Sequence, residues 1–126
     1  MKAEELRIGN YLLNDNCIVR VEHIMFSDYC LVKTKQNNSI TARYELIKPI
    51  PLTEEWLLKF GFVKNKISNE WHFGEFSIWK LSPSDPSKSK IILNLMFDID
   101  NPEIKSVHQL QNIYFALTGE ELTIKP

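Results

Sequence analysis

The sequence predicts an α+β domain, and three patterns support this class. Residues 1–50 hold short apolar stretches separated by polar turns about every ten residues, which is typical of an antiparallel sheet. Two segments with clear helix start and stop signals follow, one after Pro51 and one before Gly119. Further strand-like stretches lie between them. We therefore expect a small antiparallel β lobe over residues 1–50 and a helix–β-meander–helix lobe over residues 51–126, sharing one core.

The first lobe contains four predicted strands, with a partly closed, SH3-like barrel as one candidate form. Cys17, Val19 and Val21 alternate with Ile18, Arg20 and Glu22, which is the period of a strand. The alternation is lost from His23 onward, which predicts a bulge or a strand end there. The expected strands are residues 6–13, 17–22, 29–34 and 39–44.

The two helices carry their own boundary signals. Thr53 is placed to cap the first helix and Gly61 to end it. Ser106 and Gln109 match the capping-box spacing at the start of the last helix, and Gly119 ends it. Between the helices we expect strands near residues 62–66, 71–73 and 76–81. The nearly all-apolar run 91–97 predicts an interior strand covered on both faces.

Composition and charge place the chain among ordinary globular domains. It has 126 residues, of which 44% are apolar and 25% charged, and its formal net charge is −1, so no overall field attracts nucleic acid or anionic membrane. Cys17 and Cys30 fit small buried residues better than a disulfide framework. No signal peptide or membrane-spanning run is visible, so we expect a cytoplasmic protein that does not bind membranes.

Catalytic and metal signatures are missing from the sequence, so an enzyme is the less favoured interpretation and no cofactor is expected. The histidines do not pair with other ligands at zinc spacing. One metal-dependent alternative remains, because Asp98 and Asp100 follow the predicted interior strand, where a Mg²⁺ site could form. The plainer interpretation is a polar loop that leads into the last helix.

An aromatic and basic segment in the middle of the chain gives a second alternative, a nucleic-acid-binding module. Aromatic rings on a sheet with basic neighbours are one way of holding a single strand. The competing interpretation is that the rings form the core between sheet and helices. The candidate residues are Lys64, Lys66, Trp71, Trp79, Lys80, Lys88 and Lys90.

The favoured function is protein binding, through the polar face of the last helix. That face is rich in amides and uncharged, which is compatible with a partner surface. Packing against the first lobe explains the same residues equally well. The candidate contact residues are His108, Gln109, Gln111, Asn112 and Phe115.

Three segments resemble a family of short uncharacterised proteins of Bacteroidota genomes and of their phages and mobile elements. They are ELRIGNYLL at residues 5–13, PIPLTEEWLLKFGF at residues 49–62 and VHQLQNIYFALTGEEL at residues 107–122. The resemblance covers both ends and the middle, and leaves residues 65–105 unmatched. It implies a bacterial cytoplasm and an accessory role derived from a phage, and it carries no established activity.

Overall fold

The computed structural model describes residues 1–25, 28–67, 70–80, 89–93, 97–100 and 104–125. Its contacts divide the chain into two compact units. Unit 1 comprises Met1–Leu52 and Lys105–Glu121, and unit 2 comprises Thr53–Ile104 and Leu122–Pro126. Helices and antiparallel sheets occur together, so the predicted α+β class is confirmed.

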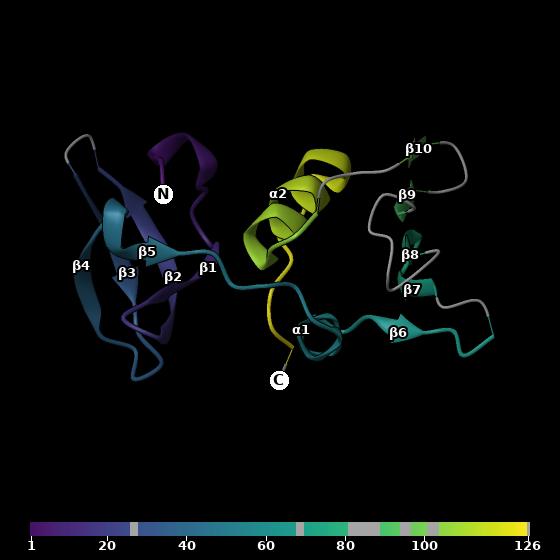
Figure 1. Cartoon of the computed structure of the whole chain (residues 1–126), viewed down its shortest axis with the longest axis horizontal. Coiled ribbons are helices and arrows are strands. Elements are labelled where there is room, and N and C mark those ends of the chain that lie inside the picture. The colour runs from purple at the N-terminus through teal and green to yellow at the C-terminus, as the bar shows by residue number, and fades with distance from the viewer. Residues whose placement is uncertain (26–27, 68–69, 81–88, 94–96, 101–103, 126) are drawn as a thin grey trace. The chain divides into compact units, whose positions relative to one another are not determined.

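Unit 1 is built on a five-stranded antiparallel sheet with the order β4-β3-β2-β1-β5 (Figure 1). A 3-10 turn, η2, separates β4 from β5. The strands are β1 (Tyr11–Asn14), β2 (Cys17–Ile24), β3 (Tyr29–Lys33), β4 (Ser39–Arg43) and β5 (Ile47–Lys48). The 3-10 turns are η1 (Ala3–Glu5) and η2 (Tyr44–Leu46).

Local sequence accounts for two details of this sheet. Asp15 and Asn16 both have positive φ, at 53° and 63°, so they form the tight two-residue turn that joins β1 to β2. The register of β2 against β3 shifts between Val21 and His23, which confirms the predicted bulge. The strand resumes beyond the shift and continues to Ile24.

The core of unit 1 lies on one face of this sheet. Its buried side chains alternate along β2 and β3, as the period of two requires. Burial raises the pKa of the Cys30 thiol, so this cysteine is an unreactive part of the core. The buried cluster comprises Leu6, Leu12, Val19, Val21, Cys30, Val32, Ala42, Tyr44 and Ile47.

The last helix, α2 (Val107–Thr118), is assigned to unit 1 by its contacts. Both predicted ends are confirmed, since Ser106 and Gln109 form a capping box and Gly119 is the C-cap. The backbone also fixes the approach to this helix, because Leu52 N donates to Lys105 O at 3.1 Å and Val107 N donates to Ile50 O at 2.9 Å.

Unit 2 contains a second five-stranded antiparallel sheet, with the order β10-β9-β8-β7-β6. Its short helix α1 (Glu54–Lys59) is capped by Thr53, whose hydroxyl accepts from Trp56 N at 3.4 Å, as predicted. The strands are β6 (Val63–Lys64), β7 (Glu70–Phe73), β8 (Phe76–Lys80), β9 (Ser89–Leu93) and β10 (Phe97–Asp100).

The expected interior strand over residues 91–97 is wrong in its extent. Residues 89–93 and 97–100 form two antiparallel strands, with Ile92 opposite Asp98 and Ile91 opposite Ile99. Phe97 and Ile99 alternate with Asp98 and Asp100, which suits an edge strand with one polar face. The nearly all-apolar composition of the run conceals the change from one strand to the next.

Candidate functional site

The polar face of α2, predicted as a partner surface, is largely bonded within unit 1. Gln111 is fully buried, and its side-chain amide binds backbone groups on either side of Asn10. Its Nε2 donates to Gly9 O at 3.0 Å, and its Oε1 accepts from Tyr11 N at 2.9 Å. Gln111 therefore lies in the interior and extends the hydrogen-bonding pattern of the segment before β1.

Asn112 continues this polar contact. Its Oδ1 accepts from Asn10 Nδ2 at 2.9 Å, and its Nδ2 donates to Glu5 O at 3.1 Å. Asn10 is itself fully buried and accepts from Arg7 N at 2.7 Å. The two amides join α2 to the segment between η1 and β1, which is the packing alternative that the sequence left open.

The other three predicted residues differ in their surroundings. His108 is buried, and its Nδ1 lies 3.1 Å from Ser106 Oγ. Gln109 caps the N-terminus of α2, since its Oε1 accepts a hydrogen bond from Lys105 N at 2.8 Å. Phe115 is 38% exposed, and the Arg7 guanidinium carbon lies 3.7 Å from its ring centroid. Of the predicted surface, Phe115 is the residue that offers an exposed apolar side chain.

Trp71, one ring of the predicted nucleic-acid surface, is 4% exposed and therefore lies in the core, as the competing interpretation expects. In the register it opposes Ile78, whereas Trp79 opposes Glu70.

The described lysines of this prediction lie on or next to three strands, β6, β8 and β9. Lys64 Nζ binds Glu54 Oε1 at 3.1 Å and lies 5.7 Å from the Trp71 ring, while Lys66 is exposed. The register places Lys90 opposite Trp79 and Lys80 opposite Ser89. Lys88 lies outside the described residues.

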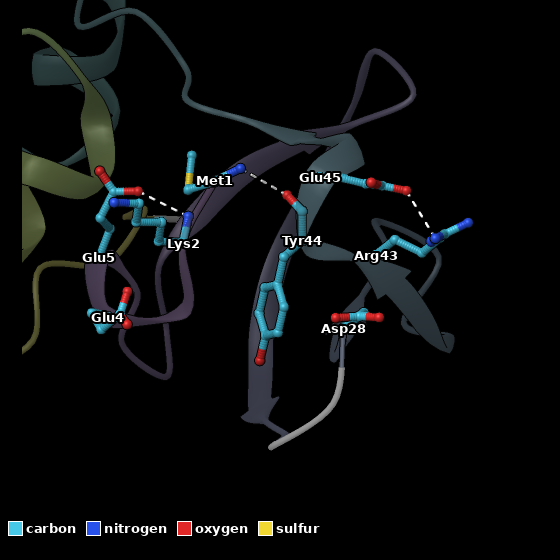
Figure 2. A pocket seen from close by; sticks show the side chains of 8 residues that line it. All are labelled: Met1, Lys2, Glu4, Glu5, Asp28, Arg43, Tyr44 and Glu45. Atoms are coloured by element: carbon cyan, nitrogen blue, oxygen red, sulfur yellow. Dashed lines mark hydrogen bonds and ion pairs between the residues drawn. The ribbon is translucent and has the colours of Figure 1, made fainter.

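A charged hollow in unit 1 was not predicted from the sequence. It has a volume of about 870 Å³ and is lined by η1, the start of β3, the end of β4 and η2. Figure 2 shows the ring of Tyr44 between the N-terminal residues on one side and Asp28 and Arg43 on the other. Its lining residues are Met1, Lys2, Glu4, Glu5, Asp28, Arg43, Tyr44 and Glu45.

Tyr44 fixes the shape of this hollow. Its phenol accepts from Met25 N at 3.1 Å and donates to Met25 O at 2.9 Å. Its own N donates to Asp28 O at 2.9 Å, and its O accepts from the Met1 amine at 3.0 Å. Burial raises the pKa of the phenol, so Tyr44 stays a neutral hydrogen-bonding group. One residue thus holds together the end of β2, the start of β3 and the N-terminal segment.

The hollow draws its lining from three separate segments, and this is why the sequence did not reveal it. Residues 1–5, 28 and 43–45 meet only when β3 pairs with β4, which sets Tyr29 opposite Arg43. The available signal was the turn position of Asp28 and the end of the strand at Arg43. Neither residue type identifies a pocket by itself.

The described residues contain neither a cluster of metal ligands nor a helix suited to crossing a membrane. Within those residues, no group of three or more His, Cys, Asp or Glu side chains could hold a metal ion. Asp98 and Asp100 lie in β10, rather than in a loop that leads to α2. None of the helices in the described ranges is long and apolar enough to cross a membrane.

Comparisons of the chain with models of protein families, with curated proteins and with solved structures give no match.

Proposed function

We propose that this protein is a protein-binding accessory factor, and that its hollow receives a basic segment of a partner protein without catalysing a reaction on it. The composition of the hollow supports this proposal. Six of its eight lining residues have charged side chains, and they come from separate parts of the chain. Unit 1 holds them around a single buried tyrosine.

The lining favours a peptide over a small organic ligand. Small-molecule sites are mostly apolar, with a few polar groups that fix orientation. Here Met1 and Tyr44 are the two lining residues without a charged side chain. A charged hollow of about 870 Å³ suits the side chains of an extended segment, which stay hydrated and form ion pairs at its rim.

The excess of negative charge in the lining predicts a positively charged partner segment. Four carboxylates line the hollow, those of Glu4, Glu5, Asp28 and Glu45, against three cationic groups, the side chains of Lys2 and Arg43 and the Met1 amine. Arg43 already pairs with Glu45 at 2.9 Å. Neither Glu4 nor Asp28 forms an ion pair with another described residue. A lysine or arginine of the partner complements these two carboxylates.

Exposed apolar side chains beside the hollow extend the contact surface. Tyr29 lies opposite Arg43 in the register, is 40% exposed, and has its ring 5.9 Å from the Arg43 guanidinium carbon. Met25, whose backbone is bonded to Tyr44, is 44% exposed. Tyrosine, methionine and arginine are enriched in protein interfaces. The partner segment is therefore basic, with at least one apolar neighbour.

The biological setting completes the proposal. The resemblance to short proteins of Bacteroidota and of their phages and mobile elements favours a bacterial cytoplasm. The partner is then a component of the host or phage machinery. Its basic segment is the feature by which this chain recognises it.

The proposal can be tested with labelled peptides and matched charge variants. Fluorescence anisotropy is measured with an eight-residue peptide containing Lys, Arg and one Leu, and with the same peptide carrying Glu in place of its basic residues. We expect the basic peptide to bind and the acidic one not to bind. The double substitution Glu4→Lys and Asp28→Lys should weaken binding by at least tenfold, through repulsion and the loss of ion pairs.

The control changes the net charge equally at positions that do not line the hollow. Glu75→Lys with Glu120→Lys alters two exposed carboxylates and should leave the affinity within about twofold at 0.15 M salt, where the Debye length is about 8 Å. The same three proteins serve as baits in a lysate. Equal loss of binding in both variants, or a lysate partner that both still retain, would contradict the proposal.

A further inference from the structure

Three polar side chains of unit 2 form a continuous hydrogen-bonded row across β7 and β8. His72 Nε2 lies 2.8 Å from Glu70 Oε2, and His72 Nδ1 lies 2.8 Å from Ser77 Oγ. Glu70 and His72 are two residues apart on one strand, so they share a face. Ser77 stands directly opposite His72 on the neighbouring strand.

The hairpin turn creates this arrangement. Gly74 has a φ of 60°, as the first position of a two-residue turn allows, and Phe73 pairs with Phe76. That turn fixes the register in which His72 opposes Ser77. The buried Trp71, Phe76 and Ile78 hold the opposite face of the hairpin in the interior. The row of three polar residues therefore rests on a well-packed support.

The carboxylate determines which nitrogen of His72 carries the hydrogen. An ionised carboxylate only accepts hydrogen bonds, so Nε2 must donate to Glu70. In the neutral imidazole, Nδ1 is then the acceptor, and the Ser77 hydroxyl donates to it. A serine that donates to a histidine oriented by a carboxylate is an activated nucleophile.

Accessibility also suits this role. The Glu70 side chain is 14% exposed, so its carboxylate is largely shielded from water, whereas the His72 side chain is 38% exposed. Ser77 is half-buried.

We propose that Ser77 is a reactive nucleophile that accepts the acyl group of an activated carboxylic ester, with His72 as general base and Glu70 as positioning residue. Ser77 Oγ forms a bond to the carbonyl carbon while its proton passes to His72 Nδ1. The tetrahedral adduct then breaks its bond to the leaving alcohol or phenol, which takes that proton. The product is an acyl-serine, which water hydrolyses. This activity is independent of the proposed peptide binding by unit 1.

The test uses p-nitrophenyl acetate, with peptide mass spectrometry to locate the acetyl group. We expect acetylation of Ser77 at a rate about 100-fold above that of other serines, which is the range of general-base assistance. Ser106 is a matched comparison within the chain, because its hydroxyl also lies near a histidine nitrogen, that of His108 at 3.1 Å. No carboxylate among the described residues bonds the other nitrogen of His108.

Variants assign the roles of the two partners. His72→Gln should lower the rate at Ser77 about 100-fold, and Ser77→Ala should remove the adduct. Glu70→Gln should lower the rate at Ser77 about tenfold, and Glu70→Asp should recover most of that loss, a rescue that a merely structural carboxylate does not produce.

Two results would overturn the proposal. The first is equal acetylation of Ser77, Ser39 and Ser106 in the wild-type protein, which needs no variant to fold. The second is a rate at Ser77 that is unchanged by His72→Gln in a protein whose circular dichroism matches the wild type.

Discussion

The side chain of Gln111 substitutes for a backbone strand beside Tyr11. Its Oε1 accepts from Tyr11 N at 2.9 Å, while its Nε2 donates to Gly9 O at 3.0 Å. The two residues are separated by 100 positions, and Gln111 is fully buried. Its amide thus satisfies one donor and one acceptor of the segment that leads into β1, which an apolar side chain cannot do.

Replacing this amide should destabilise unit 1 strongly. Gln111→Leu keeps the size of the side chain but leaves Tyr11 N and Gly9 O without their partner. Each buried polar group left unsatisfied costs about 1–3 kcal/mol, so we expect a loss of about 2–4 kcal/mol in the free energy of unfolding, measured with urea. Gln36→Leu, in an exposed turn, is the control and should change stability by less than about 0.5 kcal/mol. Equal effects at both positions would contradict this role of Gln111.

Removing the phenol oxygen of Tyr44 should make the segment at Met25 more mobile, while the buried ring continues to fill its place in the core. Tyr44→Phe deletes both hydrogen bonds to Met25 and keeps the ring in place. We expect a loss of about 1–3 kcal/mol in the free energy of unfolding and faster amide hydrogen exchange at Met25. Tyr29→Phe, on a ring that is 40% exposed, should have little effect on either. Unchanged exchange at Met25 in Tyr44→Phe would show that the phenol does not hold this segment.

The buried imidazole of His108 should make the protein less stable in mild acid. Burial lowers the pKa of His108, and this outweighs the attraction of the Glu5 carboxylate, which raises it. Below about pH 6.5 the unfolded chain takes up a proton that the folded chain resists, so the free energy of unfolding falls as pH falls. Above that pH, His108 does not make the free energy of unfolding depend on pH.

The measurement is urea unfolding at pH 7.5 and pH 5.5. His108→Gln carries no titrating group, so its stability should fall less between these two pH values than that of the wild type. A loss as large in His108→Gln as in the wild type would assign the acid sensitivity to other groups.

Gly61 should tolerate a side chain less well than Gly74. Both have positive φ, at 93° and 60°, so alanine is strained at either position. At Gly61 a Cβ would also lie 3.1 Å from Lys125 Cγ and 3.3 Å from Phe73 Cε2, whereas at Gly74 nothing lies within 4 Å. Thermal unfolding should show Gly61→Ala as the less stable variant, by about 1 kcal/mol. If Gly74→Ala were the less stable variant, the C-terminal segment around Lys125 would move aside for the new methyl group without loss of stability.

Features set by neighbouring residues could be predicted from the sequence. Ser106, Gln109 and Gly119 define α2 because capping depends on residues within one turn. The bulge after Val21 was visible for a similar reason, as a break in alternation. The reversal inside the apolar stretch at residues 91–97 was not visible, because apolar residues occupy both sides of it and hide the change of direction.

The candidate site depends on contacts that local patterns do not encode. The sequence identified Gln111 and Asn112 as an unusual amide-rich pair, and left open whether they meet a partner or the first lobe. Their hydrogen bonds to Gly9 and Asn10, about 100 residues away, show that they meet the first lobe. The hollow is still less local, since Asp28 and Arg43 become neighbours only through the pairing of β3 with β4.

Amide chemical shifts give the most direct test of the proposed protein-binding surface. The ¹⁵N-labelled protein is titrated with the unlabelled basic peptide at 0.15 M salt. We predict saturable shifts concentrated at Glu4, Asp28, Arg43 and Glu45, with the amides of unit 2 unaffected. Shifts spread over acidic residues throughout the chain, or centred on Phe115 and the start of α2, would contradict a binding site in the hollow.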